Sequence, residues 1–120
     1  MTRSSRFRLR WLVLTLLLGA TACGGDPLDD LARLEVSMVD VAFEPSRIEV
    51  DAGEPVVLTV TNRGALEHDL DLPAAGLHVH GYPGVRETTL LKIDQPGTYE
   101  ALCLTPGHAE AGMKMEVVVR

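Results

Sequence analysis

The sequence predicts an all-β domain, a sandwich or barrel of about seven or eight short strands. From residue 34 onward, apolar residues alternate with polar ones, and Gly, Pro, Asn and Asp interrupt the alternation at short intervals. No segment of useful length repeats its apolar residues at helical spacing. This pattern is typical of antiparallel sandwiches and barrels, and it argues against an α/β fold.

Residues 1–22 have the composition of a secretory signal peptide. Residues 1–10 contain four arginines and no acid, and residues 11–22, WLVLTLLLGATA, form an apolar run that ends in small residues. The run is shorter than the roughly 20 residues that a membrane-spanning helix needs. We therefore expect cleavage after residue 22, with an uncleaved membrane anchor as the alternative.

Cys23 follows the expected cleavage site, and its surroundings resemble a bacterial lipobox. Small residues precede the cysteine, although Ala20 stands where a leucine is usual. The resemblance implies that Cys23 is lipidated and that residues 23–33 tether the protein to a membrane surface. The predicted location is then the cell membrane, facing the periplasm or the cell exterior. Ordinary cleavage that leaves a free cysteine is the alternative.

The expected mature chain, residues 23–120, is strongly acidic. It keeps all 17 Asp and Glu but only seven of the 11 Lys and Arg, which gives a formal charge of −10. Such a surface argues against nucleic acid as a partner. Its length allows one small domain, expected over residues 34–120 and monomeric.

Seven segments of this domain are predicted to be strands. They are residues 34–43, 47–50, 56–61, 68–72, 85–93, 98–103 and 114–119. In the first segment the apolar positions change phase after Met38, which suggests a bulge or a strand that changes sheets. Residues 73–84 are rich in Gly, Pro and Ala, and their structure stays open.

The segment 103–113, CLTPGHAEAGM, places Cys103, His108 and Met113 at equal intervals in a loop between two strands. Two histidines, a thiolate and a weak axial methionine form the ligand set of blue copper sites. The second histidine must come from elsewhere, and His68, at the start of a strand, is the candidate. Taken singly, a cysteine or a methionine is more often a core residue. Together the four residues predict a metal site.

Two further histidines, His78 and His80, are one residue apart. In a strand they would point to the same face, so a secondary metal site is conceivable. A solvated pair at an edge or in a loop is the simpler interpretation. Asp69, which follows His68, is a candidate for hydrogen bonding around the main site.

The chain resembles the cupredoxin family over about residues 34–120. The residues that carry the resemblance are Phe43-Glu-Pro45, Ile48, Val50, Gly53, Glu67-His68-Asp69-Leu70, Gly97-Thr-Tyr99 and the ligand loop. The resemblance implies a Greek-key β-sandwich. It also implies one type 1 copper ion that cycles between Cu(I) and Cu(II), held by His68, Cys103, His108 and Met113.

The predicted function is single-electron transfer by a membrane-tethered carrier. Redox partners, one donor and one acceptor, are expected to dock near His108, where Pro106, Gly107 and Ala109 leave room for close approach. The alternative is a copper carrier that delivers the ion without redox cycling. Catalysis is not expected, because oxidases and nitrite reductases with several copper centres need more histidines than the four in this chain.

Overall fold

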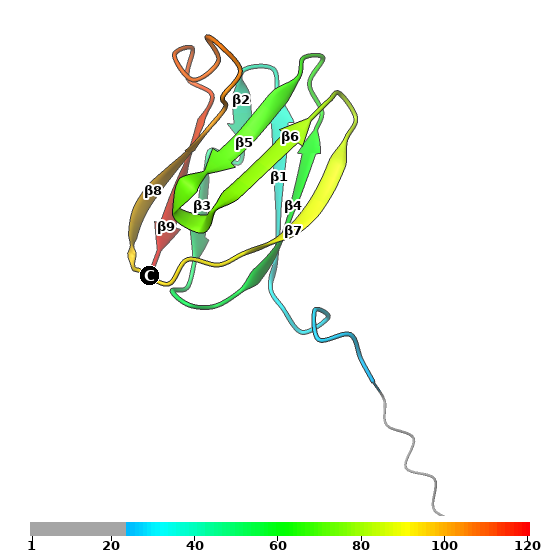
Figure 1. Cartoon of the computed structure of the whole chain (residues 1–120), viewed down its shortest axis with the longest axis vertical. Coiled ribbons are helices and arrows are strands. Elements are labelled where there is room, and N and C mark those ends of the chain that lie inside the picture. The colour runs from blue at the N-terminus through cyan, green and yellow to red at the C-terminus, as the bar shows by residue number, and fades with distance from the viewer. Residues whose placement is uncertain (1–23) are drawn as a thin grey trace, which may run out of the picture.

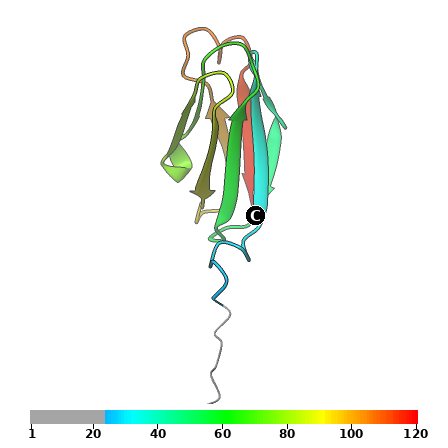
Figure 2. The same cartoon turned by 90° about the vertical axis from the view of Figure 1, so that its right-hand side faces the viewer.

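The computed structural model describes residues 24–120, in which nine strands form two packed sheets (Figure 1; Figure 2). The elements are β1 (Arg33–Val39), β2 (Ala42–Glu44), β3 (Arg47–Val50), β4 (Val56–Asn62), β5 (His68–Leu72), the 3₁₀ turn η1 (Pro73–Ala75), β6 (Leu77–Gly81), β7 (Arg86–Leu91), β8 (Gly97–Leu102) and β9 (Lys114–Val119). One sheet has the order β2-β1-β4-β7 and the other β3-β9-β8-β5-β6. The predicted all-β sandwich is confirmed, with nine strands in place of seven or eight. The expected signal peptide and Cys23 lie outside the described residues.

Two strand pairs are parallel, which the alternation pattern did not predict. β1 pairs with β4, Arg33 facing Val57, and β3 pairs with β9, Arg47 facing Glu116. Two parallel neighbours cannot be joined by a hairpin and need a longer connection. Here that connection crosses from one sheet to the other. It does so after β2 and again after β3, and β9 thereby lies between β3 and β8.

The phase change after Met38 is a tight hairpin, so the predicted bulge or change of sheet was wrong. Val39 pairs with Ala42, which leaves Asp40 and Val41 as the two turn residues. Val41 has a φ of 63°, a conformation that β-branched residues rarely adopt. The turn matters for the site because it holds Asp40 beside the β4–β5 loop, where Ala65 N–H donates to its carboxylate.

The open segment 73–84 contains η1 and the edge strand β6. β6 pairs antiparallel with β5, from Leu72 facing Leu77 to His68 facing Gly81. Its residues alternate between buried and exposed, so Leu77 and Val79 enter the core while His78 and His80 face outward.

The core lies between the sheets and reaches the ligand loop. Cys103 and Met113 belong to the same buried cluster as the strand residues Leu70, Met115 and Val117. In Figure 1 the loop, drawn in orange, lies at one end of the sandwich, and the N-terminal tether, drawn in blue, leaves from the other. Among residues 24–120, no helix has the length and apolar character needed to cross a membrane.

Candidate metal centre

The backbone of the β8–β9 loop brings its two ends together. Cys103 N–H donates to the Met113 carbonyl (3.1 Å), and Met113 N–H donates to the His108 carbonyl (2.9 Å). His108 N–H in turn donates to the Thr105 carbonyl (3.1 Å). Gly107 turns the chain with a φ of 85°, which glycine adopts without strain. Three residues that are far apart along the loop are thereby held at one point by main-chain bonds.

A buried amide positions the second segment of the site, the β4–β5 loop. Asn62, 1% exposed, donates through Nδ2 to the carbonyls of Leu66 (2.8 Å) and Gly81 (2.7 Å). Its Oδ1 accepts from Gly64 N–H (2.9 Å). These bonds fix the loop just before His68, so the imidazole enters the sandwich in one direction.

His68, Cys103 and His108 converge, as the sequence predicted. Their ligand atoms all lie within 4.8 Å of one another. Nδ1 of His68 is 3.2 Å from Nδ1 of His108, which is itself 3.6 Å from Cys103 Sγ. Metal–nitrogen bonds of about 2.0–2.1 Å hold two nitrogens at about this separation. His68 and Cys103 are almost fully buried, whereas His108 is half-buried.

The thiol of Cys103 has one further partner. Asp69 N–H donates to Cys103 Sγ (3.3 Å), and an Asp69 carboxylate oxygen accepts from Thr105 Oγ1 (3.3 Å). Asp69 therefore does hydrogen-bond around the site, but its contact with the sulfur is through the backbone. Cysteine binds metals as the thiolate, and this N–H holds the sulfur in place at the site.

Met113 is placed beside these three residues by its backbone. The residue is fully buried, and its N–H and carbonyl bond to His108 and Cys103 respectively. A thioether, a thiol and two imidazoles form a donor set that suits copper, and the main-chain bonds bring the backbone of Met113 to that of Cys103 and His108. The four predicted residues thus fit the ion that the resemblance implies.

A model of the cupredoxin-like domain matches residues 10–119 of this chain. The chain belongs to the cupredoxin family. This cupredoxin is 31% identical, over 117 residues, to the copper-resistant cuproprotein CopI of Rubrivivax gelatinosus, covering 80% of this chain and 71% of that protein. A protein of the same name from Pseudomonas aeruginosa is 34% identical over 64 residues, 53% of this chain and 33% of that one.

A solved structure agrees in fold. The reduced auracyanin of Roseiflexus castenholzii superposes with a TM-score of 0.67 at 21% sequence identity, covering 74% of this cupredoxin and 97% of that chain. At this identity the likeness establishes the sandwich and its strand arrangement.

Asp40 is a site residue that the sequence did not reveal. Its Oδ1 accepts from Ala65 N–H (2.8 Å) and lies 3.6 Å from His68 Nε2, a buried atom that has no hydrogen-bond partner among residues 24–120. The bond from Ala65 holds the pKa of the Asp40 carboxyl below its usual value. A carboxylate on this side of the ring favours a proton on Nε2, which leaves Nδ1 free to bind a metal.

Removing this carboxylate is expected to weaken metal binding. We expect Asp40→Ala to lower the affinity for copper about tenfold, because outer partners of ligating histidines contribute about 10- to 100-fold. Asp40→Asn keeps an acceptor for Ala65 N–H, so its copper affinity should lie between those of the unmodified protein and Asp40→Ala. Competition with a chromophoric copper chelator measures both. Asp51→Asn, in the β3–β4 turn, is the control; an equal loss there would mean that only net charge matters.

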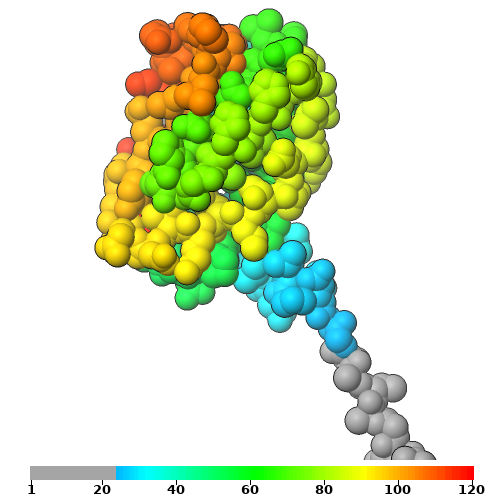
Figure 3. Space-filling model, in the orientation of Figure 1, coloured from blue at the N-terminus to red at the C-terminus, as the bar shows by residue number. Residues whose placement is uncertain are grey.

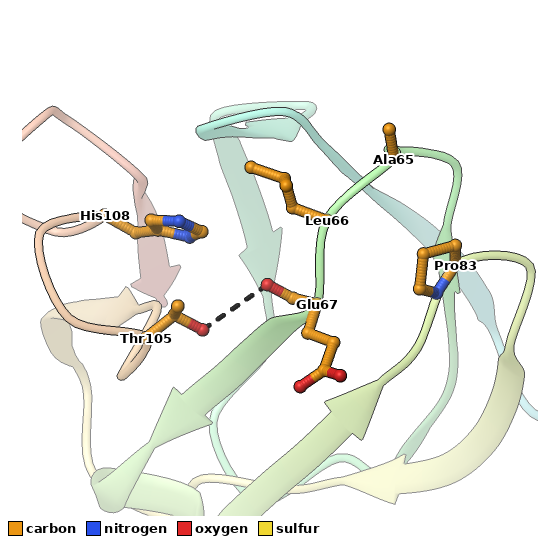
Figure 4. Close-up of a pocket in the computed structure, with 6 residues that line it drawn as sticks. All are labelled: Ala65, Leu66, Glu67, Pro83, Thr105 and His108. Atoms are coloured by element: carbon orange, nitrogen blue, oxygen red, sulfur yellow. Dashed lines mark hydrogen bonds between the residues drawn. The ribbon is translucent and has the colours of Figure 1, made fainter.

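A shallow depression of about 430 Å³ opens beside His108 (Figure 4). Its lining residues are Ala65, Leu66, Glu67, Pro83, Thr105 and His108. Thr105 Oγ1 lies 3.4 Å from the Glu67 carbonyl, so its single proton is shared between this carbonyl and the Asp69 carboxylate, and the contact joins the ligand loop to the β4–β5 loop. Figure 3 shows these orange and green segments meeting at the end of the molecule that lies away from the blue tether.

Proposed function

We propose that this cupredoxin binds one copper ion through His68, Cys103, His108 and Met113 and carries single electrons. The supporting observation is the convergence of two imidazole nitrogens and one thiol within 4.8 Å in a largely buried site. The names of the CopI relatives also associate similar chains with copper. When bound, copper would supply the Cu(I)/Cu(II) couple.

For this function the protein must keep the copper-binding atoms in fixed positions. Cys103 and Met113 are joined by a main-chain bond, and His68 is enclosed in the core. Donors that are fixed by the fold in this way move little when the charge of the site changes. A small rearrangement of donors is what repeated electron transfer requires.

We place the docking surface for the redox partners around His108. The half-buried ring borders the depression, and Leu66 and Leu104, both about half exposed, add apolar area at this end. Glu67 and Glu110 are also exposed there. A donor or acceptor with an apolar contact patch and a basic rim would complement this surface.

The proposal is tested by visible absorption and electron paramagnetic resonance spectra of the full-length chain loaded with Cu(II). We expect an intense blue or green thiolate band, a narrow copper hyperfine splitting, and reversible bleaching with a mild reductant and oxidant. A pale protein with wide hyperfine splitting would mean that Cys103 is not a ligand.

Copper delivery without redox cycling is the second candidate, and the designation of both CopI relatives as copper-resistant favours it. A delivery protein should surrender Cu(I) to a competing chelator within seconds to minutes. An electron carrier should keep its copper through many cycles of reduction and oxidation. Counting the copper that remains after repeated cycling decides between the two.

Replacing Met113 tests the axial position. Met113→Leu should retain a copper site and raise its reduction potential, because a thioether donor to the oxidised ion is lost. The change in stability should stay below about 1.5 kcal/mol, since the two side chains have similar volumes. Spectroelectrochemical titration measures the potential; complete loss of copper would show that Met113 is needed for the structure of the site.

We further propose that the protein is exported and anchored through lipid on Cys23, that it is a monomer, and that it has no catalytic activity alone. The site faces away from the tether, which leaves it accessible to partners when the N-terminus is at a membrane (Figure 1). Cys23→Ser should move the protein from the membrane fraction to the soluble exported fraction. A variant that stays in the membrane fraction after residues 1–22 have been removed would exclude a lipid anchor at Cys23.

A further inference from the structure

The outer face of the β5–β6 hairpin carries two histidines and two aspartates. Asp69 pairs directly with His80, and Asp71 pairs with His78, in the antiparallel register of the two strands. All four side chains point away from the core, because the residues between them, such as Leu70 and Val79, are buried. β6 is the edge strand of its sheet, so this face is open at one side.

Both imidazoles approach the same carboxylate oxygen. His80 Nδ1 lies 2.7 Å from Asp69 Oδ1, and His78 Nε2 lies 3.7 Å from that atom. The other nitrogen of His78, Nδ1, lies 3.3 Å from Asp71 Oδ1. Cross-strand ion pairs would account for two separate contacts. The approach of both rings to one oxygen of Asp69 is in addition the arrangement that a shared cation would use.

We propose that Asp69, His78 and His80 form a second, exposed site for a divalent cation, with Cu(II) preferred. Imidazole and carboxylate ligands suit Cu(II) and Zn(II), and Cu(II) binds more tightly in the usual order of divalent metals. In a site with bonds of about 2.0–2.2 Å, ligand atoms lie roughly 3 Å apart. His80 and Asp69 already have this spacing.

His78 must rotate to join them, because its Nε2 still lies 3.7 Å from Asp69 Oδ1. Its side chain is 51% exposed, so rotation toward Asp69 meets little packing. Asp71 contacts Nδ1 and leaves Nε2 for the cation, as carboxylates do behind many ligating histidines. Asp71 is therefore assigned a positioning role.

This site is separate from the buried centre, although Asp69 adjoins both. The buried centre uses a thiol and His68, whereas the outer site contains no sulfur donor. Its Cu(II) should give no thiolate band and a wide hyperfine splitting. Spectra therefore distinguish the two ions within one sample.

The test is a titration of the full-length chain after one equivalent of copper has filled the buried centre. Further Cu(II) is followed by paramagnetic resonance, and Zn(II) by calorimetry. We expect the unmodified chain to bind one additional ion, and the His78→Ala/His80→Ala variant to bind it at least tenfold more weakly. The visible band of the first ion should be the same in both proteins, which also shows that the variant is folded.

Two controls make the result specific. Glu87→Gln removes an exposed carboxylate from β7 in the other sheet and should leave the second ion in place. A titration in the Cys103→Ser background separates failure of the buried centre from failure of the outer one. No additional ion in the unmodified chain, or equal affinity in the double histidine variant, would overturn the proposal.

Discussion

Cys103→Ser is expected to abolish the blue or green absorption of the copper-loaded protein while leaving the sandwich folded. The band requires a thiolate donor, which a serine hydroxyl does not replace. The fold should survive because the hydroxyl can still accept from Asp69 N–H, so the cost is roughly 1–2 kcal/mol. Visible absorption and far-ultraviolet circular dichroism measure the two effects.

Leu104→Ser is the matched control, because it places the same new side chain at the exposed neighbouring position. It should retain both the band and the stability. If Cys103→Ser kept its colour, the thiol would not be a ligand and the assignment of the centre would be wrong.

Asn62→Ala is expected to destabilise the protein by about 3 kcal/mol. The change removes the side-chain donor of the Leu66 and Gly81 carbonyls, whereas Gly64 N–H keeps the Met38 carbonyl (3.2 Å) as a partner. Buried groups that lose their partner cost about 1–3 kcal/mol each. For a domain of this size the midpoint of thermal unfolding should fall by about 15 °C. Copper affinity should also fall, because the loop no longer fixes His68.

Thr59→Ala on the same strand provides the comparison. It removes one cross-strand contact, between Thr59 Oγ1 and Thr88 Oγ1 at 3.1 Å, and should cost about 1 kcal/mol. Copper affinity should not change. If both variants lost the same free energy of unfolding, the three hydrogen bonds of Asn62 would not stabilise the protein more than the single contact of Thr59. Calorimetric unfolding of the metal-free proteins measures the difference.

The sequence predicted the fold class and the convergence of three candidate ligands, because the strand signals are local and two of these residues share one loop. Alternation marks each long strand, and Cys103 and His108 lie in one loop whose strands must be neighbours. β6 was left open although Leu77-His-Val-His alternates, since five residues between Gly and Pro are too few to indicate a strand. β2, three residues long, was not separated from the strand predicted over residues 34–43. The contact between Asp40 and His68 could not be foreseen. It depends on how the β1–β2 turn packs against the β4–β5 loop, and Asp40 carries no motif.

The central position of β9 sets an order of events for acquiring the metal. β9 is the ninth strand in chain order, yet it lies between β3 and β8 and holds one end of the ligand loop. Pairing of β3 with β9 joins segments more than sixty residues apart, and such distant pairings form late and slowly. A partly synthesised chain therefore has no assembled centre. Copper should enter only after the whole domain has folded, in the compartment where folding finishes.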